Sequence, residues 1–407
     1  MNKNINRIVV LIILILNIFS LTSIVIANSS SSIKSEIYTP DVKENFNISS
    51  HIGIIYDRGS GRVLYEKNGY EKYKMASTTK IMTAIVVIEN CNLTDTVIVD
   101  KTAAGTGGSR LGLGTNDKIT VIDLLYGLML ESGNDASVAL ANFTSGNVEE
   151  FSKLMNKKSK ELGLENTNFV VPHGLDNDEH YTTAYELAKI TDYALKNEVF
   201  SNIVNTKTYN IYINGKVKKI SNTNELLGNI EGVYGVKTGF TNGAGRCLVT
   251  SCKRNGLDII NVVLGADTKQ MRVTDSIKLI EYANKYFRII DLNKIITEKF
   301  KDWDNNNKKK IEIYKGVSND LNYTLGSIRY NKIAVLEREE NNIDIDINNM
   351  LNFEAPIKKD YKTGEIVVKI ENKEIDRVEI FSSNEIKRKG IRDYFYEILG
   401  MIYWLLD

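Results

Sequence analysis

The chain has 407 residues, of which 43% are hydrophobic, so it is long and apolar enough for two or three domains with buried cores. Its 52 Lys and Arg residues nearly balance its 51 Asp and Glu residues, and no basic patch alternates with aromatic side chains. This balance excludes a typical nucleic-acid-binding protein.

The N-terminus has the pattern of an export signal. Lys3 and Arg7 precede an unbroken apolar run over residues 8–16, and apolar character continues almost to Ala27, a small residue suited to cleavage. We therefore predict a signal peptide over residues 1–27. An uncleaved anchor is the alternative, because the apolar stretch is almost long enough to span a bilayer. In either case we expect the rest of the protein outside the cytoplasm.

A polar linker is predicted over residues 28–46, and the first domain begins after it. Residues 52–56 are strand-like, and residues 63–65 resume the pattern after a turn that contains two glycines, which predicts a hairpin. Residues 77–89 start with Ser-Thr-Thr and place apolar side chains on one face, which predicts a helix.

Further helices and strands follow in blocks. Helices are predicted over residues 120–130, 149–162, 183–195 and 268–287. Strands separated by Asn and Gly turns are predicted over residues 235–241, 247–253 and 259–264. The early hairpin and these later strands bracket a helical insert. This pattern of elements predicts an α+β fold, in which an antiparallel sheet is flanked by helices.

The C-terminal part of the chain has a different pattern. Residues 291–389 contain short strands with Asn, Asp and Gly turns, which predicts a small β-rich accessory domain. Residues 390–407 place apolar side chains on one helical face, and Tyr403 and Trp404 suit a membrane interface. We predict an amphipathic helix that associates with a membrane surface; a helix docked on the β-rich domain is the alternative.

Cysteine and histidine usage gives no sign of a metal or disulfide framework. Three cysteines are too few for such a framework, and we expect Cys247 and Cys252 to be buried thiols in a strand. The three histidines form no HExxH motif, and no CxxC motif is present. We therefore expect neither a metal nor another cofactor.

Three short motifs carry the chemistry: Ser77-Thr78-Thr79-Lys80, Ser132-Gly133-Asn134 and Lys237-Thr238-Gly239. The first places a hydroxyl and an amine one helical turn apart, so that the amine can take the hydroxyl proton. The second adds a hydroxyl and a carboxamide. The third adds a cation, a hydroxyl and a glycine beside which a substrate backbone can lie. In this order they are typical of a serine acyl-transfer site.

The chain contains a second copy of each motif, so position must decide among them. Ser31-Ser32-Ile33-Lys34 lies in the linker, where no helix aligns its lysine. Ser145-Gly146-Asn147 precedes the capped start of a surface helix, whereas Ser132 follows a buried type of helix. Lys362-Thr363-Gly364, in a predicted turn, and Ser382-Ser383-Asn384 fall in the β-rich domain. We therefore choose the first three motifs.

The sequence around these motifs resembles the low-molecular-weight penicillin-binding proteins, the serine D-alanyl-D-alanine carboxypeptidase family (peptidase S11). The resembling stretches are residues 74–84, 130–136, 172–175, 180–184, 235–241 and 244–245. The resemblance covers about residues 45–290 and continues less specifically at Ala355-Pro356-Ile357. It implies a β-lactamase/transpeptidase-like domain over residues 47–290, followed by the β-rich domain over 291–389.

Residue chemistry and the resemblance together suggest the catalytic roles. Ser77, at a helix N-terminus, is the expected nucleophile, and Lys80 is its expected base. Burial and the nearby charge of Lys237 would keep Lys80 neutral. The resemblance implies that Ser132 passes the proton toward the leaving amine, and that Asn134 orients Lys80 and binds the substrate amide.

The resemblance also implies the substrate-binding roles. Lys237 and Thr238 would hold the terminal carboxylate of a D-alanyl-D-alanine peptide. Gly239 and Phe240 would present edge-strand backbone to the peptide, with oxyanion donors at the amides of Phe240 and Ser77. Arg272 matches a family arginine near that carboxylate; a plain surface arginine is the alternative. His173 lies in a matched loop, and we expect a structural role for it.

The expected reaction is acylation of Ser77 by a peptidoglycan pentapeptide, release of D-alanine and hydrolysis of the acyl-enzyme at the outer face of the cell membrane or in the cell wall. β-Lactams would acylate the same serine. DD-endopeptidase or transpeptidase activity would use the same residues and stays open. A serine β-lactamase would need a deacylating glutamate, and Glu186 and Glu225 lack the E-x-x-L-N context. A non-catalytic penicillin-binding module is disfavoured by the complete motif set.

Overall fold

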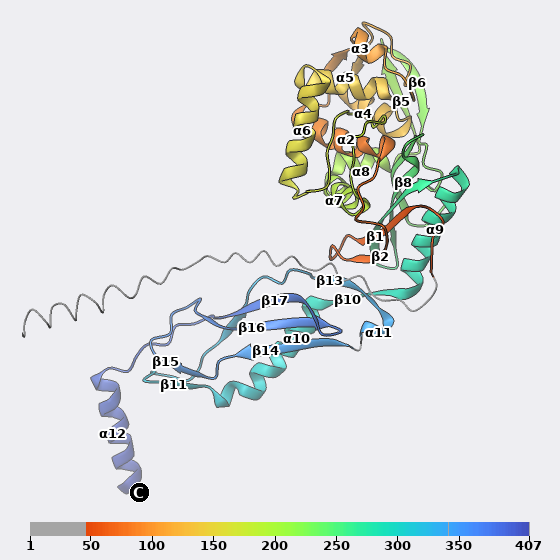
Figure 1. Ribbon diagram of the computed structural model, residues 1–407. Coiled ribbons are helices and arrows are strands. Elements are labelled where there is room, and N and C mark those ends of the chain that lie inside the picture. Colours follow the sequence, from red (N-terminus) through yellow and green to blue (C-terminus); the bar gives the residue numbers. More distant parts are fainter. Residues whose placement is uncertain (1–45, 341, 407) are drawn as a thin grey trace, which may run out of the picture. The chain divides into compact units, whose positions relative to one another are not determined.

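The computed structural model describes residues 46–340 and 342–406 (Figure 1). The predicted signal peptide over residues 1–27 lies outside the described residues, as does the linker up to residue 45. The described residues begin with helices packed on a sheet and continue into a β-rich region that ends in a helix. This is the α+β fold that the sequence predicts.

A five-stranded antiparallel sheet is the centre of the first region, with strand order β2-β1-β9-β8-β7. Its strands are β1 (Ile52–Asp57), β2 (Val63–Lys67), β7 (Val233–Thr241), β8 (Gly245–Arg254) and β9 (Leu257–Ala266). The predicted hairpin and the three predicted later strands therefore join in one sheet, through pairing of β1 with β9. Strand β7 lies at the edge of this sheet, which leaves one side of its backbone unpaired.

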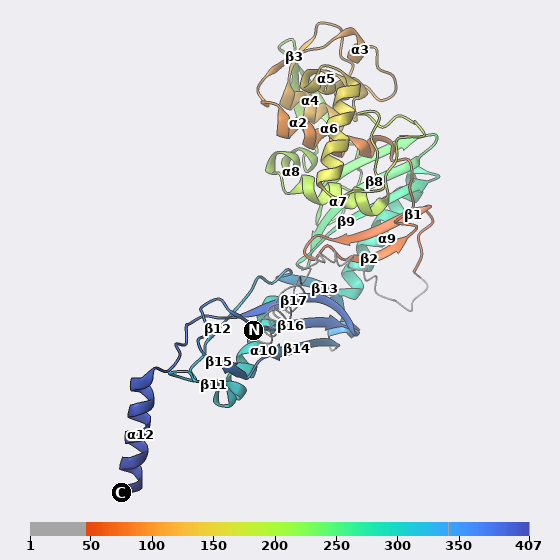
Figure 2. The same cartoon turned by 60° about the vertical axis from the view of Figure 1, so that its left-hand side comes forward.

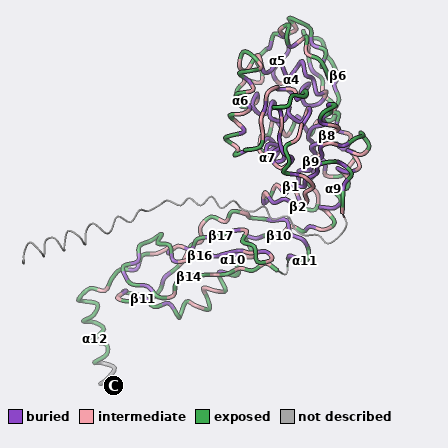
Figure 3. Tube along the Cα trace, viewed as in Figure 1, coloured by how far each residue is buried: buried purple, intermediate pink, exposed green. Residues whose placement is uncertain are grey.

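Both faces of the sheet are buried. Ile54 on β1 packs in a core cluster with α2 and α7, whereas the next residue, Ile55, packs in a second cluster with α9 (Lys269–Tyr286). Successive side chains of a strand point to opposite faces, so this division places helices on both sides. Figure 3 shows the buried residues concentrated where the sheet and these helices meet.

The segment between β2 and β7 forms the helical insert. It contains a 3-10 helix, η1 (Ala76–Thr79), and the helices α2 (Lys80–Asn90), α3 (Lys101–Ala104), α4 (Val121–Leu130), α5 (Asn134–Ser145), α6 (Val148–Glu161), α7 (Ala184–Leu195) and α8 (Glu198–Val204). It also contains two short hairpins, β3 (Thr96–Ile98) with β4 (Lys118–Thr120) and β5 (Thr208–Ile213) with β6 (Lys216–Ser221). The helices predicted over residues 120–130, 149–162, 183–195 and 268–287 are present. The short helix α3, the helices α5 and α8 and the two hairpins are not among the predicted elements.

The β-rich region is built around a four-stranded sheet with order β12-β17-β16-β14. Its strands and those beside it are β10 (Phe287–Asp291), β11 (Glu312–Tyr314), β12 (Tyr323–Leu325), β13 (Lys332–Leu336), β14 (Ile343–Asn349), β15 (Asn352–Glu354), β16 (Lys362–Ile370) and β17 (Lys373–Ser382). Two short turns, α11 (Glu337–Glu340) and a 3-10 helix, η2 (Lys308–Lys310), also occur. Figure 2 shows β14, β16 and β17 side by side in this region.

The prediction of short strands throughout residues 291–389 missed a long helix, α10 (Leu292–Asn307). Asp291 caps its N-terminus by accepting a hydrogen bond from the Lys294 amide, 2.9 Å away. Leu292, Ile296 and Phe300 recur every four residues and pack against strands of the β-rich region. The many Asn, Asp and Lys residues of this segment conceal that narrow apolar stripe.

The last helix is α12 (Ile391–Leu406), which agrees with the amphipathic helix predicted over residues 390–407. Several of its apolar side chains are exposed, and Ile391 is 90% exposed. The described side chains of this helix are therefore not packed against the β-rich domain, which was the alternative to a membrane-associating helix. None of the described helices combines the length and the apolar character that a bilayer crossing requires.

The packing of α10 predicts a difference between two isoleucines. Ile296→Ala removes a fully buried side chain and should lower the free energy of unfolding of the β-rich region by about 2–5 kcal/mol. The same substitution at exposed Ile391 should cost less than about 0.5 kcal/mol. With Trp404 replaced by Phe, Trp303 on α10 is the remaining tryptophan, and its fluorescence reports denaturant unfolding of this region. Equal losses in the two variants would show that α10 does not pack as described.

Candidate active site

The structure brings the three chosen motifs together where η1 and α2, the end of α4, and strand β7 meet. Lys80, the first residue of α2, is fully buried. Its Nζ lies 3.0 Å from Ser77 Oγ, and it donates hydrogen bonds to Asn134 Oδ1 at 2.7 Å and to the His173 carbonyl at 2.8 Å. A neutral amine has two N–H donors and one lone pair. The two carbonyl acceptors use the donors and leave the lone pair for the Ser77 hydroxyl.

The electrostatic surroundings favour that neutral form. Burial, followed by the positive charge of Lys237, holds the pKa of Lys80 well below its ordinary value. Lys237 is itself buried on β7, and burial followed by the charge of Arg272 lowers its pKa to about 7. A lowered pKa favours the neutral amine, which is the form in which Lys80 can act as a general base.

Ser77 lies in the single turn η1 rather than in the first turn of the α-helix, which begins at Lys80. The helix N-terminus predicted at Ser77 is therefore three residues later. The turn packs directly against β7, because a Cβ added to Gly239 would lie 3.0 Å from the Ser77 nitrogen and 3.1 Å from Ala76 Cβ. A larger residue than glycine at position 239 would separate η1 from β7.

Ser132 and Asn134 are held by the junction of α4 and α5. Ser132 follows the last turn of α4 in the left-handed region, with φ of 61°, and lines the cleft. Asn134 is buried at the start of α5, and its Nδ2 donates to the Gly107 carbonyl at 2.7 Å while its Oδ1 accepts from Lys80. These two contacts fix the orientation of the Asn134 carboxamide, so that its oxygen faces the lysine.

The cleft has a volume of about 300 Å³. Six of the residues chosen from sequence line it: Ser77, Ser132, Thr238, Gly239, Phe240 and Arg272. Lys80, Asn134 and Lys237 are buried behind this surface. The cleft is also lined by residues that sequence analysis did not choose: Ser109, Glu131, Thr223, Glu225, Arg246 and Lys269. Glu131 lies in the resembling stretch over residues 130–136, and Arg246 directly follows the one at 244–245 and pairs with Phe240 across β8 and β7. Glu225 was considered only as a deacylating glutamate.

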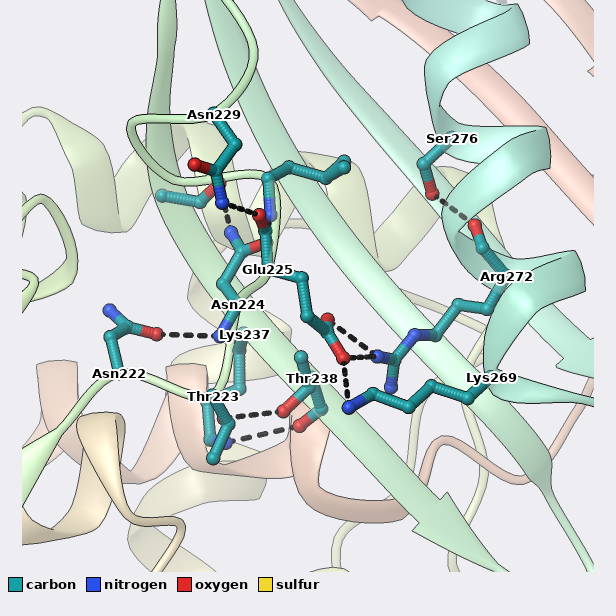
Figure 4. A network of polar contacts seen from close by, with 12 residues as sticks. Asn222, Thr223, Asn224, Glu225, Asn229, Lys237, Thr238, Lys269, Arg272 and Ser276 are labelled. Carbon is teal, nitrogen blue, oxygen red and sulfur yellow. Dashed lines mark hydrogen bonds and ion pairs between the residues drawn. The ribbon is translucent and has the colours of Figure 1, made fainter.

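Arg272 is buried in the fold, 4% exposed, and is therefore not a plain surface arginine. Its Nη2 donates to both carboxylate oxygens of Glu225, at 2.9 and 2.7 Å. Lys269, one helical turn earlier on α9, pairs with the same carboxylate at 2.7 Å. Figure 4 shows both cations directed at Glu225, beside Thr238 and Thr223, whose hydroxyls lie 2.7 Å apart.

The glutamates considered for a β-lactamase have other partners. Glu186 accepts hydrogen bonds from the backbone amides of Glu165 and Asn166, and Glu225 pairs with two cations. The His173 ring accepts a hydrogen bond from the Leu175 amide through Nδ1, which stabilises the loop that supplies the carbonyl to Lys80. Burial is the main cause that lowers the pKa of His173 to about 3.

The duplicate motifs lie away from this constellation or outside the described residues. Ser31 is not among the described residues. Ser145 ends α5, where its hydroxyl donates to the Ala141 carbonyl at 3.0 Å. Lys362 begins strand β16 rather than lying in the predicted turn, and Ser382 ends β17. Cys247 and Cys252 are free, buried thiols, as predicted.

A serine hydrogen-bonded to a buried lysine of lowered pKa, next to an edge strand with Lys-Thr-Gly, is typical of a serine enzyme of the penicillin-binding class. A family model described as D-alanyl-D-alanine carboxypeptidase, peptidase S11, matches residues 39–268. The chain belongs to this family.

Curated relatives extend the similarity over most of the chain. D-alanyl-D-alanine carboxypeptidase DacF of Bacillus subtilis is 34% identical over 85% of this chain and 88% of its own length. DacC of Escherichia coli is 31% identical over 87% of this chain and 88% of its own length. The resemblance deduced from the motifs is thereby confirmed, and the protein is a serine-type carboxypeptidase by class.

Solved structures confirm the fold. Penicillin-binding protein 5 of Haemophilus influenzae has a TM-score of 0.69 at 28% identity and covers 86% of this chain and 100% of its own. The Streptomyces K15 DD-transpeptidase has a TM-score of 0.56 at 35% identity and covers 60% of this chain and 98% of its own. Similarity to the larger protein therefore extends into the β-rich region.

The position of Lys237 predicts how acylation depends on pH. The neutral form of Lys80 predominates above its pKa in the folded protein, so acylation should slow as the pH falls through that value. Lys237→Met removes a charge that lowers the pKa of Lys80, so this acidic limb should move to higher pH by about 0.5–1 unit. The measurement is the β-lactam acylation rate against pH, each variant scaled to its own maximum. Lys253→Met, at an exposed lysine of β8, should leave the limb in place, and an equal shift in both variants would contradict this account.

Proposed function

We propose that this protein is an exported, penicillin-sensitive carboxypeptidase that removes the terminal D-alanine from peptidoglycan pentapeptide through an acyl-enzyme on Ser77. The observation that carries the proposal is the position of Lys80. Its amine is buried, lies 3.0 Å from the Ser77 hydroxyl and donates to two carbonyl oxygens, and its pKa is held well below the ordinary value by burial and the charge of Lys237. The names of the relatives, which are D-alanyl-D-alanine carboxypeptidases, support the choice of substrate.

In the acylation step, Ser77 Oγ attacks the carbonyl carbon of the penultimate D-alanine, and its proton passes to Lys80 Nζ. The backbone amides of Ser77 and Phe240 would donate to the oxyanion. As the intermediate collapses, the C–N bond breaks, and the proton moves through Ser132 to the leaving amine. D-alanine departs, and Lys80 then activates the water that hydrolyses the ester.

Substrate binding follows from the edge position of β7. An extended peptide can add to the unpaired side of β7, next to Gly239 and Phe240. The terminal carboxylate would then lie at the end of the cleft that contains Thr238 and Arg272, with Lys237 behind them. Glu186 and Glu225 bond to other partners and not to Ser77. This supports slow hydrolysis of a β-lactam adduct, because neither carboxylate is paired with the nucleophile.

For the remaining parts of the chain, we propose a signal peptide over residues 1–27, a linker over 28–46 and a catalytic domain over 47–290. A β-rich accessory domain over 291–389 would follow, and the last helix would bind the outer surface of the cell membrane. Exposed apolar side chains on α12, Ile391, Phe395 and Ile398 among them, support this last step. Acidic residues on the same helix, such as Asp393 and Glu397, make apolar area rather than charge the source of binding.

The site assignment predicts where penicillin attaches. Intact-mass analysis after incubation with benzylpenicillin should show one penicilloyl group, and peptide mapping should place it on Ser77. Ser77→Ala should carry no adduct and should release no D-alanine from a pentapeptide, because the hydroxyl that forms the ester is absent. Ser145→Ala, a serine of the duplicate motif, should react like the parent protein. An adduct on any other residue would overturn the proposal.

The membrane assignment predicts binding to lipid vesicles. The mature chain should co-sediment with vesicles of mixed zwitterionic and anionic lipid, and about 0.5 M salt should change the bound fraction little, since the apolar effect is not screened. Ile398→Asp places a charge on the apolar face and should reduce binding at least about tenfold. A chain that ends at Lys389 should not sediment. Binding that is lost in salt but retained in Ile398→Asp would refute an apolar mechanism.

A further inference from the structure

The arginine of the cleft, Arg272, is already paired with a carboxylate of the protein, Glu225. Glu225 lies in the loop before β7, lines the cleft, and bonds to Nη2 of Arg272 through both oxygens. Lys269 contacts the same carboxylate at 2.7 Å (Figure 4). Arg272 is 4% exposed, whereas Glu225 is 29% exposed and Lys269 64% exposed. The glutamate therefore lies between the buried arginine and solvent.

The loop holds Glu225 in this place. The residue before it, Asn224, donates from Nδ2 to the Gly235 carbonyl at 2.8 Å and accepts from the Leu226 amide at 3.1 Å. The amide of Asn224 in turn donates to Asn222 Oδ1 at 2.9 Å. Leu226, on the other side of Glu225, is buried. Because the backbone is tied to β7 on one side and to the core on the other, the glutamate is a fixed part of the cleft wall.

The charge of Glu225 opposes a second anion at the same place. Burial alone would raise its pKa, but the hydrogen bond from Lys269 and the charge of Arg272 outweigh burial and lower it, so the side chain is ionised at neutral pH. A ligand carboxylate at Arg272 must approach this anion and compete with it for Nη2, the guanidinium nitrogen to which both Glu225 oxygens bond. Lys269 remains as a partner for Glu225 when Arg272 changes partner.

We propose that Glu225 is a specificity-determining residue that acts as an internal competitor for the terminal carboxylate of the substrate. The proposal rests on the proposed function, in which that carboxylate binds at the Arg272 end of the cleft. Binding exchanges the pair of Arg272 with Glu225 for a pair of Arg272 with the ligand, and Glu225 stays with Lys269. The binding of ligands that have few contacts besides their carboxylate, such as free D-alanine, is thereby disfavoured. A peptide that also adds to β7 has further contacts that drive the exchange.

A purely supporting role for Glu225 predicts the opposite result. If the glutamate only oriented Arg272, its removal would leave the arginine misplaced and carboxylate ligands would bind less well. If it competes, its removal frees the arginine and they bind better. The sign of the effect therefore separates the two roles.

The experiment compares Glu225→Gln with the parent protein, using benzylpenicillin and its uncharged methyl ester. The readout is the second-order rate constant for acylation of Ser77, followed by intact mass. Glu225→Gln should raise the constant for the acid about five- to tenfold, the size expected for removing one nearby like charge in a partly solvated cleft. The constant for the ester should stay within about twofold, since the ester has no charge to attract.

The matched control is Glu231→Gln. Glu231 is exposed, lies in the same connection to β7, and contacts Arg254 through its main-chain carbonyl. Its substitution removes the same charge from the protein outside the cleft, so both constants should be unchanged. A rise for acid and ester alike, no change, or a fall for the acid in Glu225→Gln would each overturn the proposal.

A second variant covers the case in which Glu225→Gln does not fold. Lys269→Gln leaves Glu225 with Arg272 as its remaining cation and alters an exposed side chain. The acid constant should fall about threefold while the ester constant holds, and an unchanged or raised acid constant would contradict the proposal. Failure of the proposed function would be distinct, because the parent protein itself would then form no adduct on Ser77.

Discussion

The site depends on one constraint, the burial of a lysine amine in a place that disfavours its charged form. Lys80 has no exposed surface, and the groups around its nitrogen are a hydroxyl and two carbonyl oxygens rather than a carboxylate. Burial of an ammonium is costly, and together with the charge of Lys237 it outweighs the opposing charge of Asp135 and holds the pKa of Lys80 well below its ordinary value. In the proposed mechanism, this lowered pKa is what allows Lys80 to take the proton of Ser77.

The rest of the fold serves to close this pocket. Its walls come from η1 and α2, the α4–α5 junction and β7, which are far apart in sequence. They meet because β1 pairs with β9, which places β8 and then the edge strand β7 in the same sheet. Gly239 lets η1 lie against β7, and Asn134 spans from the Gly107 carbonyl to the lysine. An edge strand is usually a hazard for aggregation. Here three residues of the strand, Thr238, Gly239 and Phe240, line the cleft, and the proposed function uses this edge to bind an extended peptide.

The sequence was sufficient for the sheet, for most helices and for choosing three motifs that meet at one cleft, because these depend on local periodicity and on residue types with special chemistry. The sequence was insufficient where only a few residues of a segment determine its packing. The α10 stripe of Leu292, Ile296 and Phe300 is hidden among charged and amide side chains. Glu225 and Lys269 had no motif at all, since their importance arises from where the loop before β7 meets α9. Glu225 was even weighed for a different role, as a deacylating base, which its ion pairs do not support.

The cations of the site form a series in which each depends on the next. The charge of Lys237 lowers the pKa of Lys80, and the charge of Arg272 lowers the pKa of Lys237. Glu225 acts on Arg272 in the opposite direction, since it favours the charged guanidinium. A ligand carboxylate beside Arg272 would offset the repulsion that Lys237 experiences and favour its protonated form. A protonated Lys237 in turn disfavours a proton on Lys80. In the proposed mechanism, an anion bound at one end of the cleft would therefore disfavour the charged form of Lys80 at the other.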